Sequence, residues 1–265
     1  MMMKRIAMVL CVIMICLAVL PALGEATIRG YNDTEKFCYV HLGTYPMTAE
    51  GERGPVLWRV LDVSNGQALM LADQILDVQQ VIFCDNMKDS DARKFRKISD
   101  YGESDLHTWM NETMLADLCS EQDFSSALVE GQYGRLYPLT IDQLLMPEYG
   151  FSKTRWVSDD KRIACRQFSA TDYAKNHELY EGYTKPVNNK LYVDRKWGCS
   201  SAWVANVKDP KDIKLGLIGY NGHISYGVYT RVNVGVLPAL TLDLSKCTVS
   251  GGNGTAEDPF TISVP

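Results

Sequence analysis

The chain has 265 residues, of which 46% are hydrophobic and 10% aromatic, and its formal net charge is −5 at pH 7. This composition can bury a sizeable core, and one domain of this length is within the normal range. The mild acidity and the lack of a basic cluster in the sequence exclude a nucleic acid as the expected partner, because a phosphate backbone is bound by grouped lysines and arginines.

The N-terminus has the pattern of a secretory signal peptide. Lys4 and Arg5 precede an apolar run over residues 6–20, and small residues follow at Ala22 and Gly24. The run is shorter than the roughly 20 residues that a membrane-spanning helix needs. We therefore expect residues 1–24 to be removed, with Ala26 as the alternative cleavage site, and the mature chain to be secreted or associated with the cell surface without a membrane span.

Six cysteines follow the predicted cleavage site, and an even number suits disulfide bonding in an exported protein. No CxxC pair or suitably spaced histidine accompanies them, so we predict no metal site. The disulfide candidates are Cys38, Cys84, Cys119, Cys165, Cys199 and Cys247. If the first and last strands are neighbours, Cys38 is expected to pair with Cys247.

The first half of the chain begins with predicted strands. Residues 37–43 alternate as in a strand, and residues 56–63 (VLWRVLDV) form a stronger one. Asn65-Gly66 then predicts a hairpin turn, with residues 67–72 as the returning strand. Residues 85–103 are highly charged and predict a long surface loop; a calcium loop is excluded because the required final glutamate is missing.

Four helices are predicted in the middle of the chain. Ser104 or Asp105 caps the first, and apolar residues three and four apart define its buried face. Ser120 and Asp123 resemble a capping box for a second helix, and Thr140 and Gln143 for a third. Ser169 or Thr171 caps a fourth over residues 172–176. The buried face of the first helix comprises Leu106, Trp109, Met110, Met114 and Leu118, that of the second Phe124 and Leu128, and the third ends at Pro147 and Gly150.

The C-terminal region returns to strands. Asn221-Gly222 predicts a second hairpin within residues 216–244, followed by one closing strand through Val232, Val234 and Val236. Residues 246–265 are expected to form a β tail. Strands at both ends of the chain, helices in the middle and long irregular loops indicate an α+β fold.

Residues 180–230 are enriched in aromatic side chains interleaved with Gly, Asn and Ser, a mixture typical of recognition surfaces. The aromatic residues are Tyr180, Tyr183, Tyr192, Trp197, Trp203, Tyr220, Tyr226 and Tyr229. Trp197 and Trp203 fit either a core or a surface position, whereas Tyr226 and Tyr229 favour exposure. With Asn221 and His223, these four residues form the predicted binding set.

Five motifs occur in an order that resembles a bacterial secreted domain family of unknown function: VLWRVLDV, QALMLADQILD, SDLHTWMNETM, GRLYPLTIDQLL and GVLPALTLDL. The resemblance covers about residues 36–244. That family is distantly similar to the C-type-lectin-like scaffold of the formylglycine-generating enzymes. The resemblance implies one C-type-lectin-like domain over residues 36–245, after a leader over residues 25–35. This chain has Leu237 where the family has arginine, and we add Arg231 to the binding set because it is a candidate to replace that residue.

The sequence contains no GxSxG or HExxH motif, and the combination of Cys199 with His223 is the single thiol–imidazole candidate. The EPN and QPD motifs of calcium-dependent sugar binding are also missing. We therefore predict a recognition or cell-envelope protein that binds an extracellular glycan or protein without catalysis, cofactor or metal. The alternatives are a secreted enzyme on the same scaffold and a structural envelope module stabilised by disulfides.

Overall fold

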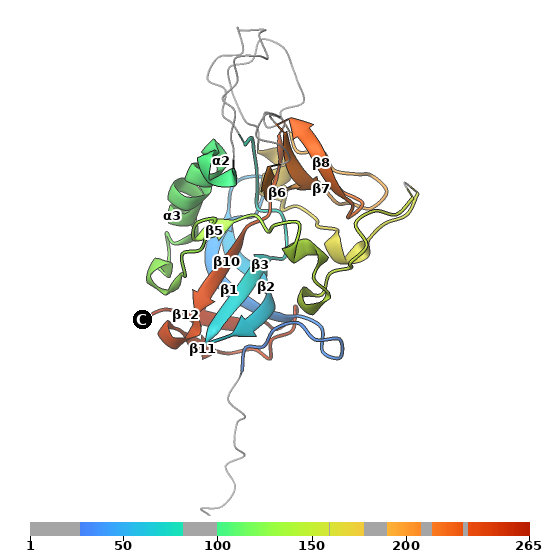
Figure 1. Cartoon of the computed structure of the whole chain (residues 1–265). Coiled ribbons are helices and arrows are strands. Elements are labelled where there is room, and N and C mark those ends of the chain that lie inside the picture. Colours follow the sequence, from blue (N-terminus) through green and yellow to red (C-terminus); the bar gives the residue numbers. More distant parts are fainter. Residues whose placement is uncertain (1–26, 82–99, 159, 178–189, 208–213, 230–232) are drawn as a thin grey trace, which may run out of the picture.

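The structure is a computed structural model that describes residues 27–81, 100–158, 160–177, 190–207, 214–229 and 233–265 (Figure 1). Two β-sheets and a few short helices form the fold, which confirms the α+β prediction. The larger sheet occupies the lower half of Figure 1, while the strands of the smaller sheet and the main helix lie above it on opposite sides. The predicted signal peptide lies outside the described residues.

The larger sheet has seven strands in the order β11-β12-β1-β2-β3-β10-β5. All neighbouring strands are antiparallel except β1 and β12, which are parallel. The strands are β1 (Cys38–Pro46), β2 (Arg53–Ser64), β3 (Gln67–Ala72), β5 (Leu136–Tyr137), β10 (Ala239–Asp243), β11 (Thr248–Ser250) and β12 (Phe260–Ser263).

The smaller sheet has five strands in the order β4-β9-β6-β7-β8. In it β6 and β9 are parallel, and the other neighbours are antiparallel. The strands are β4 (Asp77–Gln79), β6 (Ala202–Val207), β7 (Lys214–Ile218), β8 (Ile224–Tyr229) and β9 (Val234–Val236).

The hairpin predicted at Asn65-Gly66 is confirmed. Both turn residues have positive φ angles, 53° and 73°, which is the conformation of a type I′ turn. Ser64 faces Gln67 across the turn, so the register follows directly from the two-residue connection. In β2 the fully buried Trp58 donates from Nε1 to the carbonyl of Leu42 at 2.8 Å, which satisfies its one polar atom.

The first predicted helix is confirmed and begins at Ser104, whose hydroxyl accepts from the His107 N–H at 3.0 Å. It consists of α2 (Asp105–Trp109), the π-helical turn η3 (Met110–Met114) and α3 (Leu115–Leu118). Leu106, Met110, Met114 and Leu118 are fully buried as predicted, and Trp109 is half-buried. Residues 85–99 of the predicted surface loop lie outside the described residues. The last residues of that loop form the 3₁₀ turn η2 (Tyr101–Glu103), in which Tyr101 is buried.

The second predicted helix is wrong, because only the 3₁₀ turn η4 (Ser125–Ala127) forms there. The Asp123 carboxylate accepts from the Ser125 N–H at 2.9 Å, which makes a local turn instead of capping a helix. Leu128 is already extended and pairs with Leu242 of β10. Phe124 and Leu128 are nevertheless buried, so the apolar pattern was informative about the core and not about the helix.

The other two capping predictions are confirmed. Thr140 accepts from the Gln143 N–H at 3.2 Å while Gln143 Oε1 accepts from the Thr140 N–H at 2.9 Å, which is the reciprocal pair of a capping box. The third predicted helix is nevertheless wrong, because only the 3₁₀ turns η5 (Gln143–Leu145) and η6 (Pro147–Tyr149) form there. Pro147 begins η6 instead of ending a helix, and Gly150 follows η6 in the left-handed conformation. Of the two candidates for the fourth helix, Thr171 caps α4 (Asp172–Asn176), accepting from the Ala174 N–H at 3.1 Å.

The predicted closing strand is divided between the two sheets, so its description as one strand is wrong. Its first part is β9 in the smaller sheet and its second part is β10 in the larger one. Leu237 and Pro238 connect them. Proline cannot donate a ladder hydrogen bond, and the Pro238 carbonyl accepts from the Ala72 N–H at 2.9 Å instead. The chain therefore passes between sheets at this point, with Leu237 buried in the core.

One continuous core extends from Ile28 to Ile262. The predicted boundaries at residues 35 and 245 therefore do not separate structural units. In the tail, the 3₁₀ turn η8 (Leu244–Lys246) leads into β11, and β12 lies next to β1. The Gly254 carbonyl accepts from the Tyr39 N–H at 2.8 Å, which adds a further bond between the tail and the first strand.

The five described cysteines are free thiols, and Cys84 lies outside the described residues. The expected pair of Cys38 and Cys247 is not bonded, although the first and last strands are neighbours as expected. Cys247 directly precedes β11, which is separated from β1 by β12. Two strand spacings are about 9.6 Å, whereas the Cα atoms of a disulfide lie no more than about 7 Å apart.

Across the described residues, no helix is both long enough and apolar enough to traverse a lipid bilayer.

Candidate functional site

Exposed aromatic side chains gather around the β7–β8 hairpin. The described residues have three exposed large hydrophobic side chains: Trp156 (57% exposed), Tyr192 (60%) and Tyr226 (36%). Tyr226 belongs to β8, and the other two contact the connection between β7 and β8. Together with Trp197 and Tyr220 they form what we call the aromatic face.

The first half of the aromatic face is centred on Tyr220. Its ring lies 5.7 Å from that of Tyr192 in an edge-to-face arrangement and 5.9 Å from that of Trp197. The Lys196 ammonium lies 4.7 Å from the centre of the Trp197 ring, within the range of a cation–π contact. The rings thus hold one another in place at the end of the hairpin.

The second half of the face is formed by residues 155 and 156 against β8. Arg155 and Ile224 exchange backbone and side-chain bonds: the Ile224 N–H donates to the Arg155 carbonyl at 3.2 Å, and Arg155 Nε donates to the Ile224 carbonyl at 3.3 Å. The Arg155 guanidinium lies 4.3 Å from the centre of the Tyr226 ring. Trp156 packs on the His223 ring at 4.5 Å.

A buried arginine holds the segments beneath this face. The Arg166 side chain is fully buried, and its guanidinium donates to the carbonyls of Gly222 (3.0 Å), Leu144 (3.0 Å), Ser152 (2.6 Å) and Thr154. Burial lowers the pKa of Arg166, but a guanidinium remains charged in proteins. Four carbonyls from three segments therefore surround one cation, which fixes the hairpin end relative to residues 152–154.

The hairpin end also packs closely on Ile163. The Ile163 N–H donates to the Asn221 carbonyl at 2.9 Å. Gly222 has a φ angle of 79°, and a Cβ atom placed on it would lie 2.2 Å from the Ile163 carbonyl oxygen. Glycine is therefore required at this position both by its backbone conformation and by the space available.

The structure brings three residues of the predicted binding set to the face: Trp197, which is half-buried, the exposed Tyr226, and Asn221. The Asn221 side chain is used internally, since Nδ2 donates to His223 Nδ1 at 3.0 Å. Tyr229 is the last residue of β8, opposite Lys214, and its side chain is not described. Arg231 lies outside the described residues.

Two members of the predicted binding set are corrected. Trp203 is 1% exposed and donates from Nε1 to the Gln79 carbonyl at 2.8 Å, so it belongs to the core between β6 and β4. His223 is 2% exposed and lies beneath Trp156. Trp203 lies in β6 and His223 directly precedes β8, and the neighbouring residues in the sequence do not indicate that either side chain is buried.

Several residues of the site were not predicted. Trp156 is a single aromatic residue in a polar stretch, outside the aromatic-rich region, and Tyr192 was counted in that region without being singled out. Arg155 and Arg166 have no sequence signal of their own. Their roles depend on carbonyl groups and rings far away in the chain, which only the fold brings together.

A second cluster surrounds the buried carboxylate of Asp77 in β4. Its Oδ2 accepts from the Tyr45 hydroxyl at 2.5 Å, and its Oδ1 accepts from His177 Nδ1 at 2.5 Å and from the Val78 N–H at 2.7 Å. The Asp77 side chain is 2% exposed and that of His177 30%. The hydrogen bond to Asp77 raises the pKa of His177, and burial together with the Asp77 charge raises the pKa of Tyr45.

A carboxylate that orients an imidazole through Nδ1 is one part of a nucleophilic triad. No sequence motif indicates this pair. Among the described residues, however, no serine, threonine or cysteine hydrogen-bonds to His177, and the cluster links β1, β4 and the end of α4. The thiol–imidazole candidate, Cys199 with His223, is not assembled either, because the Cys199 thiol donates to the Trp197 carbonyl at 3.3 Å. Burial raises the pKa of this thiol.

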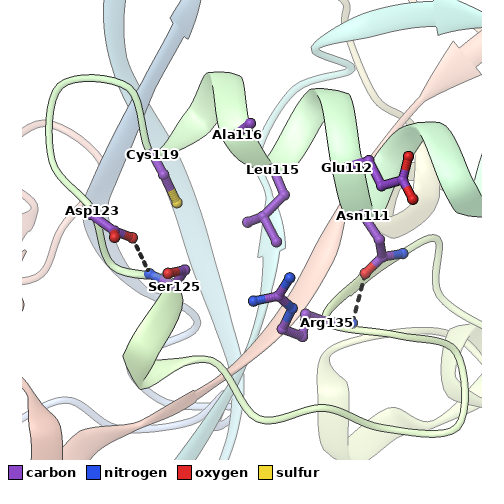
Figure 2. Close-up of a pocket in the computed structure, with 8 residues that line it drawn as sticks. All are labelled: Asn111, Glu112, Leu115, Ala116, Cys119, Asp123, Ser125 and Arg135. Atoms are coloured by element: carbon purple, nitrogen blue, oxygen red, sulfur yellow. Dashed lines mark hydrogen bonds between the residues drawn. The ribbon is translucent and has the colours of Figure 1, made fainter.

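A hollow of about 500 Å³ lies on another part of the surface, beside the main helix (Figure 2). Arg135 points into its centre, with Asp123 and Glu112 toward opposite ends. Asn111, which lies in an NxT sequon, is fully engaged in the wall: its amide donates to the carbonyls of His107 and Leu136 and accepts from the N–H groups of Arg135 and Leu136. The lining residues are Asn111, Glu112, Leu115, Ala116, Cys119, Asp123, Ser125 and Arg135.

The part of the chain that the structure describes holds no group of three or more His, Cys, Asp or Glu side chains able to bind a metal ion. No protein-family model, curated protein or solved structure matches the chain. Its function is therefore argued from the geometry of the aromatic face, the Asp77 cluster and the hollow.

Proposed function

We propose that this chain is an exported recognition protein that binds an extracellular glycan through the aromatic face. The observation that carries the proposal is that all three exposed large hydrophobic side chains of the described residues gather around one hairpin end. A sugar ring presents a face of C–H groups, which stacks on the flat surface of tryptophan or tyrosine, while its hydroxyls bond to nearby polar groups. Export is proposed from the signal-peptide pattern.

The rigidity of the face supports a binding role. Arg166 fixes the hairpin end and residues 152–154 in one arrangement before any ligand arrives. A ligand that binds a preorganised surface does not have to order it, and this lowers the free-energy cost of association. A structural role alone does not explain the exposed aromatic rings, because each ring leaves apolar surface in contact with water at a cost in free energy.

A glycan fits the face better than a protein surface does. The rings occupy two parts of the face: in one, Tyr192 and Trp197 pack on Tyr220, and in the other Trp156 packs on His223 while Tyr226 lies beside Arg155. The centre of a protein interface is usually a contiguous apolar patch with a polar rim. Two groups of rings, each with polar side chains around it, can contact successive sugar units of one polysaccharide.

For the fold, we propose a scaffold of the C-type-lectin-like kind. The order of the sequence motifs supports this assignment, as does the adjacency of the first and last strands, β1 and β12. On this proposal the larger sheet closes the domain and the smaller sheet carries the ligand face.

The test is to measure binding to an array of microbial and plant polysaccharides, followed by titration calorimetry with a retained glycan. We expect Trp156→Ala and Trp197→Ala each to lower the affinity roughly twofold to tenfold. The matched control is Tyr133→Ala, which removes a half-buried ring beside β5, outside the face. Wild-type affinity in both tryptophan variants, or failure of the wild type to bind any glycan, would refute the proposal.

A secreted enzyme is the second candidate, because Asp77 orients the half-exposed imidazole of His177. The same experiment separates the two. If the glycan is recovered intact after prolonged incubation, recognition is supported. If it is cleaved and His177→Gln abolishes the cleavage, the enzyme is supported instead.

A further inference from the structure

The aromatic face lies among basic side chains, although the chain as a whole has a formal charge of −5. Two segments flank the β7–β8 hairpin, residues 151–168 and 190–200. Their described acidic residues are Asp160 and Asp194. Their exposed basic residues are Lys153, Arg155, Lys161, Arg162, Lys190, Arg195 and Lys196. This part of the surface therefore carries a positive charge that the composition of the whole chain conceals.

Most basic side chains elsewhere in the described residues are neutralised by a neighbouring carboxylate. Arg29 pairs with Glu35 at 2.7 Å, Arg53 with Asp117 at 2.6 Å, and Lys175 with Asp172 at 2.9 Å. Arg59 with Asp73 and Lys246 with Asp243 follow the same pattern.

Six of the exposed basic residues beside the face are not paired in this way. In the described part of the chain, no carboxylate lies within ion-pair distance of Arg155, Arg162 or Lys196, nor of Lys153, Lys161 or Arg195. Asp194 forms no ion pair with these six residues, and its Oδ1 accepts from the backbone N–H groups of Lys196 and Trp197, which shapes the turn. The positive charge is therefore available to a ligand.

The cations and the rings alternate over the same surface. Arg155 lies over Tyr226 at 4.3 Å and Lys196 over Trp197 at 4.7 Å, one cation in each half of the face. Arg162 directly precedes Ile163, whose N–H is bonded to the hairpin end at Asn221. A sugar stacked on either ring group would thus have a cation next to it.

From this arrangement we infer that the ligand is an anionic glycan, with a carboxylate or phosphate group on its repeating unit. The inference rests on the proposed function and specifies its ligand class. A repeating anion is implied because the cations accompany both ring groups, so that one chain can engage them in succession. Exposed guanidinium and ammonium groups suit both anions, with arginine able to donate two parallel bonds to either.

Single-stranded nucleic acid also combines anions with stacking groups, but the face favours it less. Arg155 and Lys196 already cover one side of Tyr226 and Trp197, which reduces the ring surface open to bases. Nucleic acid is therefore an outcome that the experiment must be able to detect.

The experiment measures the binding of four probes to the full-length mature protein: polygalacturonate, its fully methyl-esterified form, a mannan whose repeating unit carries a phosphate, and oligo-dT. We expect at least one of the two anionic glycan polymers to bind more tightly than the uncharged ester, with an affinity that falls as salt is raised. The comparison of the galacturonate with the phosphate polymer identifies which anion is preferred.

The variants test which cations are responsible. Arg155→Gln and Lys196→Gln are each expected to lower the affinity for the bound anionic polymer about twofold to fivefold at low salt, and by a larger factor than they lower the affinity for the ester. Lys36→Gln is the matched control, because Lys36 is an exposed cation that lies over a tyrosine ring, Tyr31, outside the face. Arg135→Gln removes the cation of the hollow in Figure 2.

The outcomes separate this inference from the proposed function. Equal affinity for the ester and the acid, with dependence on Trp156 and Trp197, would overturn the inference and keep the glycan-binding proposal. An effect of Arg135→Gln larger than those of the face variants would assign the anion to the hollow and overturn it too. Tighter binding of oligo-dT than of every glycan, or no binding of any glycan, would overturn both.

Discussion

At the scale of single residues, two buried ionisable groups organise this protein, and each does so through several hydrogen bonds. Arg166 gathers four carbonyl groups from three segments, and Asp77 gathers a hydroxyl, an imidazole and a backbone N–H. A buried charge is tolerated only when such bonds replace the water that it loses. Both groups therefore specify one arrangement of the segments around them.

The pair of Asp77 and His177 predicts a pH dependence of stability. The pKa of His177 is raised above its ordinary value of 6.5 by the hydrogen bond to Asp77. The folded state then binds the proton more tightly than the unfolded state, so the stabilisation is complete below pH 6.5 and is lost as the pH rises through the folded pKa. We expect the difference in unfolding free energy between the wild type and His177→Gln to shrink between about pH 5.5 and pH 9, as measured by urea denaturation.

His41 provides a control, because its pKa is shifted in the opposite direction to that of His177. Burial lowers its pKa, so the unfolded state takes up the proton first and acidification destabilises the fold. In His41→Gln this acid-dependent loss should disappear, whereas the loss at alkaline pH should persist. A pH profile of His177→Gln that is parallel to that of the wild type would contradict the role given to the Asp77 bond.

At the scale of elements, the β7–β8 hairpin is where scaffold and site meet. The five residues from Gly219 to His223 connect the strands, and the Gly219 N–H donates to the His223 carbonyl at 2.7 Å. The predicted Asn221-Gly222 hairpin is therefore confirmed, but its connection is longer than the two residues that the Asn-Gly pair suggests. Its shape is set by Ile163 and Arg166, which are distant in sequence.

Gly222→Ala should damage both stability and the face. The new Cβ would collide with the Ile163 carbonyl oxygen, and alanine is strained at a φ angle of 79°. We expect a loss of about 3 kcal/mol or more in unfolding free energy, together with weaker glycan binding because the hairpin end is displaced. Chemical denaturation and titration calorimetry measure the two effects.

Gly66→Ala is the matched comparison, since Gly66 also has a positive φ angle of 73° but a Cβ there would meet no atom within 4 Å. It should cost only the conformational strain, about 1–2 kcal/mol, and leave glycan binding unchanged. Similar losses in the two variants would show that the contact with Ile163 is unimportant.

At the scale of the whole molecule, the C-terminal tail completes the larger sheet. β12 pairs in parallel with β1, and both Phe260 and Ile262 are buried. The smaller sheet, whose β7–β8 hairpin contributes to the aromatic face, lies above the larger sheet in Figure 1. Residues at the end of the chain thus contribute to the same core that supports the ligand face.

Ile262→Ala is expected to lower the unfolding free energy by about 2–5 kcal/mol, because it leaves a cavity between the tail and the first strands. Thr261→Ala, the adjacent exposed position on the same strand, should change it by no more than about 0.5 kcal/mol. Equal stability of both variants in urea denaturation would mean that the tail is an accessory segment, as the predicted boundary at residue 245 implied.

The sequence by itself determined the features that depend on neighbouring residues. Periodicity and turn chemistry predicted β1, the β2–β3 hairpin and the buried face of the helix that begins at Ser104. The caps at Thr140 and Thr171 were also predicted, because a cap requires only residues three positions apart. The aromatic enrichment of residues 180–230 also includes four of the five residues of the aromatic face, all but Trp156.

Only the tertiary structure decided which of those aromatic residues are exposed and what accompanies them. Trp203 and Trp197 lie in the same short stretch of the sequence, yet Trp203 donates its N–H to a core carbonyl and Trp197 lies half-buried beside Lys196. Burial and charge neutralisation depend on contacts between residues far apart in the chain. For the same reason the Arg166 bonds, the Asp77 cluster and the basic surroundings of the aromatic face could not be derived from local pattern or net charge.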